Sequence, residues 1–480
     1  MNKKKILLDF RKKLDEINYL VLYKEICGSV NFMFNPFQTE AAVVSAINDL
    51  PMELSSLMKF FVLGKAIERD IIVEFMGLQL VDNLVMLGLI EKDNGLLQLR
   101  NYVIVAYKDF YLVVNKPPFF FGGTSRSEDV YIGPDSYMLA NFLPHRHFDK
   151  CLELCSGSGV ISILNAQNSN SCDAVELNSH ACEVSSWNCI INFADDKVHL
   201  HHGDLYNPIQ SECYDLIVAN PPFIPFPTDL TFYPMCGAGG ELGLDIINNI
   251  IYGLDQHLKD NGMFLMIGEG VKNGDNIPMA ALIEEALNVG YEIDLYIHSV
   301  ENLRTHVVKM ANFCRATWDN ETPKNIEELL LNMHNMHDMT EYFQFTLIAK
   351  KIYKNKRTHF SKIKLQRERS IEGLYKSNLD KCEIRKLPNY YALYQGDDLI
   401  ASVDEDAIDL LQKKDLDIIE YACKICDERN YDDKERSEFL EKIEKTSKDL
   451  IKANLLKKID SNKYSTLTKP KVTYIKEVEI

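Results

Sequence analysis

The sequence lacks the features that mark membrane and secreted proteins. It has no uninterrupted apolar run near the roughly 20 residues that a helix needs to cross a bilayer. Its opening residues, MNKKKILLDFRKKLDEI, return to a charged residue every few positions, which predicts an amphipathic helix and not the apolar segment of a signal peptide. These two absences favour a cytoplasmic protein that does not enter a membrane.

Basic residues are scarce in the middle of the chain. Residues 151–300 contain 20 acidic residues, three lysines and no arginine, within a chain of net charge −17. Because binding to nucleic acid usually needs Lys and Arg to replace phosphate counterions, this region is expected to repel polyanions. Residues 351–386 differ, with 12 basic and 4 acidic residues. We interpret that segment as a solvated basic linker; a docking patch for RNA or an acidic partner is the alternative.

A metal-binding pattern is also missing. The 12 cysteines are scattered, and the single CxxC, formed by Cys423 and Cys426, has no second pair to complete a zinc site. Scattered free cysteines of this kind behave as small apolar residues. We therefore predict no bound metal.

The chain length and its patterns divide the sequence into four segments, since domains usually span roughly 100 to 200 residues. Residues 1–118 combine helical spacing with a hairpin around a DNG turn, which predicts a helical, winged-helix-like domain. Residues 119–350 alternate apolar strands with helix-length segments, which predicts an α/β fold with a mainly parallel sheet. The basic linker 351–386 follows, and residues 387–480 are expected to form a small α+β domain.

A glycine turn follows the first strong strand of the α/β region. In CLELCSGSGVISILNA, Gly157 and Gly159 would let the backbone approach a ligand, and the helix that begins there offers free N–H groups. A second strand ends in Glu176, where a carboxylate can bind both ribose hydroxyls. A third element presents Asp204, which is suited to accept a hydrogen bond from an adenine amino group. With no phosphate-binding lysine nearby, the pattern favours a cationic nucleoside cofactor, S-adenosyl-L-methionine.

The stretch DLIVANPPFIPFP ends another strand abruptly. Pro221 and Pro222 cannot continue a strand, because proline lacks the backbone donor and has a fixed φ. The side-chain oxygen of Asn220 and the backbone oxygen of Pro221 can accept two N–H bonds from an amide or amino nitrogen, and so orient it for reaction. Phe223 can stack on the flat face of the same group. Residues 220–223 therefore form a stiff corner at the end of a strand, where a ligand group can be held.

Taken in order, ELCSGSG, VELN, GDLY and NPPF resemble the class I S-adenosylmethionine-dependent methyltransferases, in particular the branch whose (N/D/S)PP(Y/F) motif serves nitrogen methylation. The segment IGPDSYMLA, residues 132–140, resembles the entry segment of the release-factor glutamine methyltransferases. Residues 1–118 resemble the helical extension of some bacterial members. The resemblance implies a Rossmann-like, seven-stranded sheet over residues 119–350, with the catalytic role at Asn220, Pro221, Pro222 and Phe223.

The same resemblance implies a set of cofactor contacts: Glu153, Cys155, Ser156, Gly157, Gly159, Glu176, Leu177, Asn178, Asp204, Leu205 and Asn220. One position departs from the family pattern. Cys155 stands where many relatives have the first glycine of the loop.

Four functions fit these motifs and this charge distribution. The favoured one is methyl transfer to an amide or amino nitrogen, with a protein glutamine as acceptor, because the acidic α/β region does not suit nucleic acid. One alternative is a methyltransferase for RNA or DNA bases that binds the nucleic acid through residues 351–386. The others are a tailoring enzyme that methylates a peptide or small metabolite, and a non-catalytic scaffold that senses the cofactor. Glutamine, adenine and guanine all present a planar nitrogen with two hydrogens, so all three fit the motif.

Overall fold

The structure is a computed structural model that describes residues 2–27, 40–116, 129–230, 232–233, 237–318, 321–352 and 356–364, followed by short segments between 374 and 479. The chain forms two compact units. The first comprises Met1–Leu20, Ser56–Leu365 and Val472–Ile480, and the second comprises Val21–Ser55 and Gln366–Lys471.

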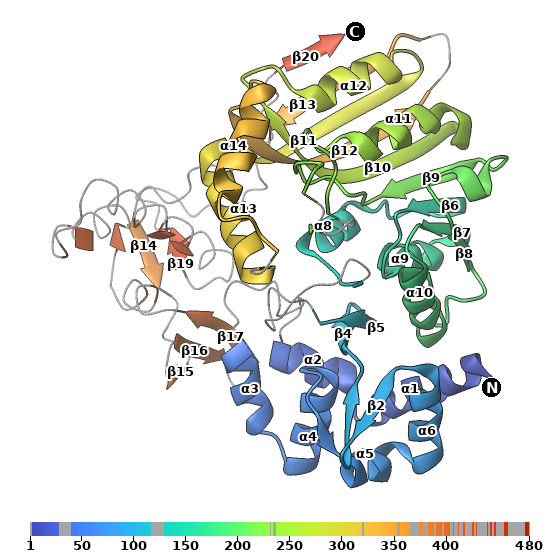
Figure 1. The fold of residues 1–480 in the computed structure, drawn as a ribbon, viewed down its shortest axis with the longest axis vertical. Helices are drawn as coiled ribbons and strands as arrows, with labels where there is room; N and C mark the ends of the chain where they lie inside the picture. Colours follow the sequence, from blue (N-terminus) through green and yellow to red (C-terminus); the bar gives the residue numbers. More distant parts are fainter. Residues whose placement is uncertain are drawn as a thin grey trace. The chain divides into compact units, whose positions relative to one another are not determined.

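A nine-stranded mixed sheet forms the centre of the first unit, in the order β20-β13-β11-β12-β10-β9-β6-β7-β8 (Figure 1). Neighbouring strands from β10 to β8 run parallel, and β12 is antiparallel to both β10 and β11. The strands are β6 (Phe148–Leu154), β7 (Ser169–Glu176), β8 (Val198–His202), β9 (Tyr214–Ala219), β10 (Leu258–Lys272), β11 (Tyr291–Asn302), β12 (Glu341–Lys351), β13 (His359–Lys364) and β20 (Lys476–Glu479). The predicted α/β class and its seven-stranded Rossmann-like core, β6 to β12, are confirmed.

Two strands extend this core beyond the expected sheet. β13 pairs in parallel with β11, and β20 pairs antiparallel with β13. The linker expected over residues 351–386 therefore needs correction, because its first part belongs to the sheet. The reason is that Phe360, Ser361 and Ile363 are buried, which fits a strand inside a sheet and not a solvated linker.

Helices cover both faces of the sheet (Figure 1). Those on one face are α11 (Asp245–His257) and α12 (Pro278–Ala286), and those on the other are α8 (Pro134–Phe142), α9 (Val160–Gln167) and α10 (Ser179–Ile191). Helix α11 buries Ile247, Ile250, Ile251 and Leu254, whose spacing places them on one side of a helix. They join the inward residues of the strands, among them Phe264 and Met266, in the main core.

A helical pair is inserted between β11 and β12. It consists of α13 (Leu303–Thr317) and α14 (Ile326–Met336), which pack against the loop that follows β9. Phe226 and Tyr233 stack with ring centroids 4.4 Å apart, and Tyr233 lies 5.3 Å from Trp318, measured in the same way. These aromatic contacts hold the loop after the Asn-Pro-Pro-Phe motif against the insertion.

Helices and two hairpins precede the large sheet. The elements are α1 (Lys3–Glu16), α2 (Tyr19–Cys27), α4 (Met52–Phe61), β1 (Ile67–Glu68), α5 (Arg69–Met76), α6 (Leu78–Leu87), β2 (Ile90–Asp93), β3 (Leu96–Leu99), β4 (Tyr102–Tyr107) and β5 (Phe110–Asn115). β2 and β3 form the hairpin predicted at the DNG turn, where Asn94 and Gly95 both have positive φ, as a two-residue turn of this type requires.

The division into units differs from the expected domain at residues 1–118. Residues 56–116 lie in the same unit as the large sheet. Asn188 of α10 and Asn192, which follows that helix, form hydrogen bonds with the backbone of β5. Local patterns in the sequence do not reveal such long-range contacts.

The second unit contains α3 (Glu40–Asn48) and two small antiparallel sheets, in the orders β18-β14-β19 and β15-β16-β17. Its strands are β14 (Leu374–Ser377), β15 (Glu383–Leu387), β16 (Tyr390–Gln395), β17 (Asp398–Val403), β18 (Leu416–Asp417) and β19 (Leu456–Lys458). Its boundaries differ from the expected domain at 387–480, since it also takes residues 21–55 and 366–386 and leaves β20 to the first unit. In the described part of the chain, no helix has both the length and the apolar character needed to cross a membrane.

Candidate active site

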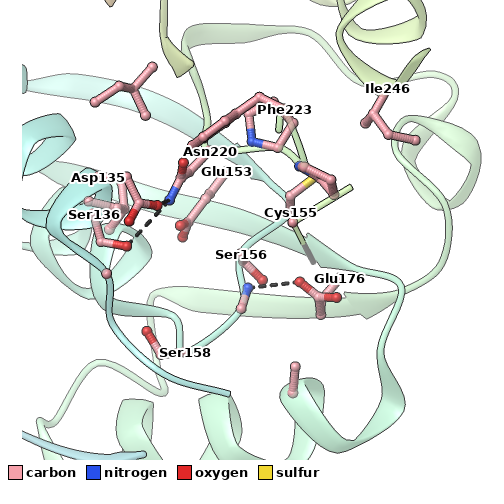
Figure 2. A pocket seen from close by; sticks show the side chains of 18 of the residues that line it. Asp135, Ser136, Glu153, Cys155, Ser156, Ser158, Glu176, Asn220, Phe223 and Ile246 are labelled. Carbon is pink, nitrogen blue, oxygen red and sulfur yellow. Dashed lines mark hydrogen bonds between the residues drawn. The ribbon is translucent and has the colours of Figure 1, made fainter. Parts of the chain in front are cut away.

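A cavity of about 510 Å³ lies at the carboxyl ends of the parallel strands. It is lined by the turns after β6, β7, β8 and β9, by part of β10 and by the start of α8 (Figure 2). The carboxyl ends of parallel strands are where open α/β sheets bind their ligands. The position of the cavity therefore makes it the candidate active site.

The turn after β6 depends on backbone conformations that favour glycine. Gly157 and Gly159 have φ values of +50° and +77°. A Cβ atom on Gly159 would lie 2.2 Å from Oγ of Ser185, whereas one on Gly157 would meet no atom within 4 Å. Gly159 thus allows α9 to lie close to α10, and Gly157 leaves open space for a ligand.

Cys155 adopts the same left-handed region, with φ of +58°. This conformation costs a non-glycine residue about 1 to 2 kcal/mol. The strain explains physically why glycine is the favourable residue at this position of the loop. Burial raises the pKa of the Cys155 thiol well above its usual value, so the side chain is a neutral, apolar part of the wall.

Glu176 ends β7 and holds the glycine loop (Figure 2). Its two carboxylate oxygens accept hydrogen bonds from the backbone N–H groups of Gly157 and Asn178, both at 2.8 Å. Asn178 in turn caps the first turn of α10 by accepting from the N–H of His180 at 2.9 Å. The carboxylate is therefore fixed beside the cavity while part of its surface stays accessible.

Glu153 lies inside the fold at the end of β6. One carboxylate oxygen accepts hydrogen bonds from the backbone N–H of Ser162, at 2.7 Å, and from its hydroxyl. This contact satisfies a free N–H group in the first turn of α9. Burial raises the pKa of Glu153 to about 8, against the opposing hydrogen bonds from Ser162. Glu153 touches the cavity, but the contacts of its carboxylate are with the start of α9.

Asn220 follows β9 and meets the start of α8 (Figure 2). Its Nδ2 donates to Oδ2 of Asp135 at 2.5 Å and to Oγ of Ser136 at 3.3 Å. These contacts determine which way the amide points. Its Oδ1 is buried and has no hydrogen-bond partner among the described residues. A buried acceptor without a partner costs about 1 to 3 kcal/mol, a penalty that an N–H group of a ligand can remove.

The charged residues that line the cavity are all acidic. They are Asp129, Asp135, Glu153, Glu176, Asp204 and Glu269, and the described lining contains no Lys, Arg or His. A cavity with this composition favours a cationic ligand and disfavours phosphate. Among the described residues, no group of three or more His, Cys, Asp or Glu side chains could hold a metal ion.

One known family matches the segment that builds the cavity. The family described as methyltransferase small domain matches residues 127–291, which include the glycine loop and the Asn-Pro-Pro-Phe motif. These residues match a methyltransferase domain. The predicted resemblance to S-adenosylmethionine-dependent methyltransferases is thereby confirmed for the segment that builds the cavity.

Two kinds of curated relative resemble part of this chain. The ribosomal protein uL3 glutamine methyltransferase of Bradyrhizobium diazoefficiens is 36% identical over 132 residues, which are 25% of this chain and 41% of the relative. The tRNA1(Val) (adenine(37)-N6)-methyltransferase of Yersinia pestis is 32% identical over 97 residues, 19% of this chain and 39% of the relative. The chain thus spans less than half the length of these relatives.

The structure brings the residues predicted for the methyltransferase domain together. The four motif residues Asn220, Pro221, Pro222 and Phe223 line the cavity, as do all the predicted cofactor contacts except Gly159. Gly159 contributes instead by its close approach to Ser185. Three lining carboxyls were not singled out in the sequence, Asp129, Asp135 and Glu269. Signals in the sequence existed for the last two. The available signals were a carboxyl in the segment IGPDSYMLA and a single carboxyl inside the apolar strand GMFLMIGEG.

Proposed function

We propose that this chain is an S-adenosyl-L-methionine-dependent methyltransferase that methylates the side-chain amide nitrogen of a protein glutamine. The observation that carries the proposal is the amide of Asn220. Its nitrogen is bonded to Asp135 and Ser136, and its oxygen, buried and without a described partner, remains to accept an N–H group.

The cavity fits the proposed cofactor. Glu176 and Asp204 both line it. Glu176 would accept hydrogen bonds from the ribose hydroxyls, and Asp204, which follows β8, would accept one from the adenine amino group. The open space at Gly157 admits the nucleoside against the backbone, and the acidic lining suits a cation. When bound, S-adenosylmethionine supplies a methyl group on a positively charged sulfur.

The Asn-Pro-Pro-Phe motif would position the acceptor nitrogen. An amide nitrogen is a weak nucleophile, because its lone pair is delocalised into the carbonyl group. Oδ1 of Asn220 and the backbone oxygen of Pro221 would accept its two N–H bonds, fix its orientation and stabilise the positive charge that develops on it. Neighbouring atoms cover Oδ1 in this structure, so the acceptor has to displace them when it binds.

The motif residues are held rigidly. The backbone of Ile224 bonds to that of Gly237 at 2.8 Å and to that of Gly239 at 2.9 Å. A Cβ atom on Gly239 would lie 2.8 Å from Cα of Phe223, so only glycine allows this close approach. The ring of Phe223 is thereby kept at the cavity, where it can stack on a planar acceptor.

A protein amide is favoured over a nucleobase as acceptor. The acidic lining would repel the phosphates that flank a base in RNA. Lys351, in the basic stretch, is buried and donates to the backbone oxygens of Asp255 and Leu258 at 2.6 and 3.0 Å. Lys362 lies 3.6 Å from a carboxylate oxygen of Glu284. These two lysines contact other residues of the fold, so they are less available to bind the phosphates of a nucleic acid.

The test uses S-adenosylmethionine with a labelled methyl group. The protein is incubated with separated pools of cellular protein, RNA, DNA and small metabolites, and the labelled product is digested to its monomers. We expect label in the protein pool, recovered as N-methylglutamine. The matched control is Asn220→Ala, which should keep its affinity for S-adenosylmethionine in calorimetry and lose about 100-fold in transfer, the scale of removing one positioned hydrogen-bonding group.

Each outcome distinguishes one candidate. Label on adenine in the RNA pool would favour the activity named for the tRNA-modifying relatives and refute the glutamine acceptor. Equal transfer by the wild type and Asn220→Ala would refute the role of Asn220. No binding of S-adenosylmethionine by the wild type would overturn the whole proposal.

A further inference from the structure

Glu269 is a carboxyl in the cavity wall that the proposed function does not yet use. It lies in β10, and its side chain is partly exposed toward the cavity that it lines. The hydroxyl of Tyr342 donates to Oε2, and Nε2 of Gln344 donates to Oε1 at 2.8 Å. Both donors come from β12, so the carboxyl is held in place by the neighbouring strand.

The register of the sheet places Glu269 on the same side as Asn220. Met266 pairs with Ala219 across β10 and β9, and both point into the core beneath α11 and α12. Side chains alternate along a strand, so Asn220 and Glu269 project from the opposite face, which α8 covers. Gln344 pairs directly with Glu269 and shares this face. The cavity lies on this side of the sheet.

Methylation of an amide or amino nitrogen requires the loss of one proton. As the nitrogen forms its bond to the methyl carbon, it becomes more acidic, and one N–H bond has to break. In a cavity that a bound cofactor and acceptor fill, water is excluded and the proton needs a protein group.

The other carboxyls of the lining already serve the fold, the proposed cofactor side or the motif. Asp129 accepts from Nδ2 of Asn101 at 3.3 Å, and Asp204 belongs with Glu176 to the proposed cofactor side. Glu153 bonds to Ser162 at the start of α9. Glu176 bonds to the backbone of Gly157 and Asn178 and belongs to the cofactor side. Asp135 accepts from Nδ2 of Asn220 and so positions the motif.

We propose that Glu269 is the base that takes the proton from the acceptor nitrogen, an assignment that rests on the proposed function. The nitrogen lone pair forms the new bond to carbon, and the electron pair of the carbon–sulfur bond leaves with sulfur. Once the nitrogen is positively charged, one of its N–H groups turns from the carbonyl oxygen that held it toward Glu269. The electron pair of the broken N–H bond stays on nitrogen, and the proton moves to the Glu269 carboxylate. Neutral Glu269 then loses the proton to solvent when the products leave.

The surroundings of Glu269 suit this role. Burial raises its pKa to about 7; the hydrogen bond from Gln344 opposes the rise, and the carboxyls of Asp135 and Glu301 add to it. The hydroxyl of Tyr342 is also in contact with it. A base whose pKa lies near the working pH is ionised often enough to act and basic enough to take the proton.

The first experiment needs no acceptor. Calorimetry in two buffers of different ionisation enthalpy measures the protons released at pH 7 when S-adenosylmethionine binds, and S-adenosylhomocysteine, which lacks the positive charge on sulfur, serves as the matched ligand. The cation should lower the pKa of Glu269, so the wild type should release more protons with S-adenosylmethionine. This excess should fall by half or more in Glu269→Gln and persist in Glu341→Gln, which alters an ion pair with Lys272 outside the cavity.

The second experiment measures turnover against the labelled protein pool. Glu269→Gln should lower kcat by about 100- to 1,000-fold, the usual contribution of a general base, with little change in KM for S-adenosylmethionine. Because the carboxylate is the active form, kcat/KM of the wild type, which reports the free enzyme, should rise with pH through about 7, and this rise should be absent in the variant.

The results separate this assignment from the proposed function. If the wild type does not bind S-adenosylmethionine, both are overturned. If it binds, and Glu269→Gln releases the same excess of protons or keeps kcat within twofold of the wild type, only the role of Glu269 is overturned.

Discussion

The side chain of Asn188 connects the glycine loop to the hairpin formed by β4 and β5. Its Nδ2 donates to the backbone oxygen of Ser158 at 2.9 Å and to that of Val113 at 3.1 Å, and its Oδ1 accepts from the N–H of Val113 at 2.7 Å. One turn later, Asn192, which follows α10, makes the equivalent pair of bonds with the backbone of Tyr111. The two asparagine side chains form hydrogen bonds with the backbone of β5 as a neighbouring strand would. Of the two, Asn188 also bonds to the glycine loop, at Ser158.

We predict that Asn188→Ala and Asn192→Ala differ in their effect on cofactor binding. Both variants leave buried backbone groups of β5 without partners, so each should lower the free energy of unfolding by about 1 to 3 kcal/mol. Asn188→Ala also releases the oxygen of Ser158, so it should weaken S-adenosylmethionine binding several-fold. Urea denaturation and calorimetry give the two quantities. Equal affinities in the two variants would contradict the link through Asn188.

Replacing Cys155 tests the strain in the glycine loop. Cys155→Gly removes the cost of a side chain at φ of +58°, whereas Cys155→Ala removes only the sulfur. The glycine variant should therefore be more stable than the alanine variant by about 1 kcal/mol, although glycine in general lowers stability through chain entropy. Thermal unfolding of the pair measures the difference. A less stable glycine variant would show that the loop does not hold this conformation in solution.

Asp135 should position Asn220 without contacting the reacting atoms. Asp135→Ala removes the partner at 2.5 Å from Nδ2, so the amide can turn over and present nitrogen where oxygen is needed. We expect kcat to fall about 10- to 100-fold, with unchanged affinity for S-adenosylmethionine. Asp135→Asn keeps an acceptor oxygen and should recover part of the loss. Ser136→Ala removes only the 3.3 Å contact and is the matched control with a smaller effect. A loss of the same size in Ser136→Ala would argue against this role.

The raised pKa of Glu153 predicts a pH dependence of stability. Its folded-state pKa of about 8 lies above the ordinary value of 4.5, so between these values the folded protein holds the proton more tightly than the unfolded chain. The free energy of unfolding should then fall as pH rises from about 5 to 8. Glu153→Gln cannot ionise and should lose less stability over this window, with Glu341→Gln as the control. Urea denaturation at pH 5 and pH 8 measures the change. Identical losses in the wild type and Glu153→Gln would show that Glu153 does not titrate in this range.

The sequence predicted the features that depend on neighbouring residues. The apolar strands, the glycine turn at Gly157 and the end of β9 at Asn220 follow from local periodicity and from the backbone limits of glycine and proline. Because parallel strands align their carboxyl ends, the order of these motifs was enough to bring Glu176, Asp204 and Asn220 to one cavity.

The features that the sequence did not predict depend on residues far apart in the chain. Asp135 and Asn220 are 85 positions apart, and their contact exists only because α8 lies over the end of β9. Glu269 faces the cavity because side chains alternate between the two faces of β10. The residues around it in the sequence are mostly apolar, so its orientation could not be recognised from them. The left-handed conformation of Cys155 likewise comes from the packing of the turn, since cysteine itself has no preference for it.

The pairing of β20 with β13 affects the order in which the units can fold during synthesis and the way the chain can be divided into fragments. Residues 366–471 are synthesised before β20, so the first unit gains this edge strand only after most of the second has left the ribosome. The second unit also needs residues 21–55, which are synthesised first. A fragment cut after residue 365 would leave one edge of the sheet uncovered and separate residues 21–55 from the rest of their unit. Truncation at one site therefore does not yield either unit with all of its segments. Separate units require circular permutation or co-expression of the segments that belong together.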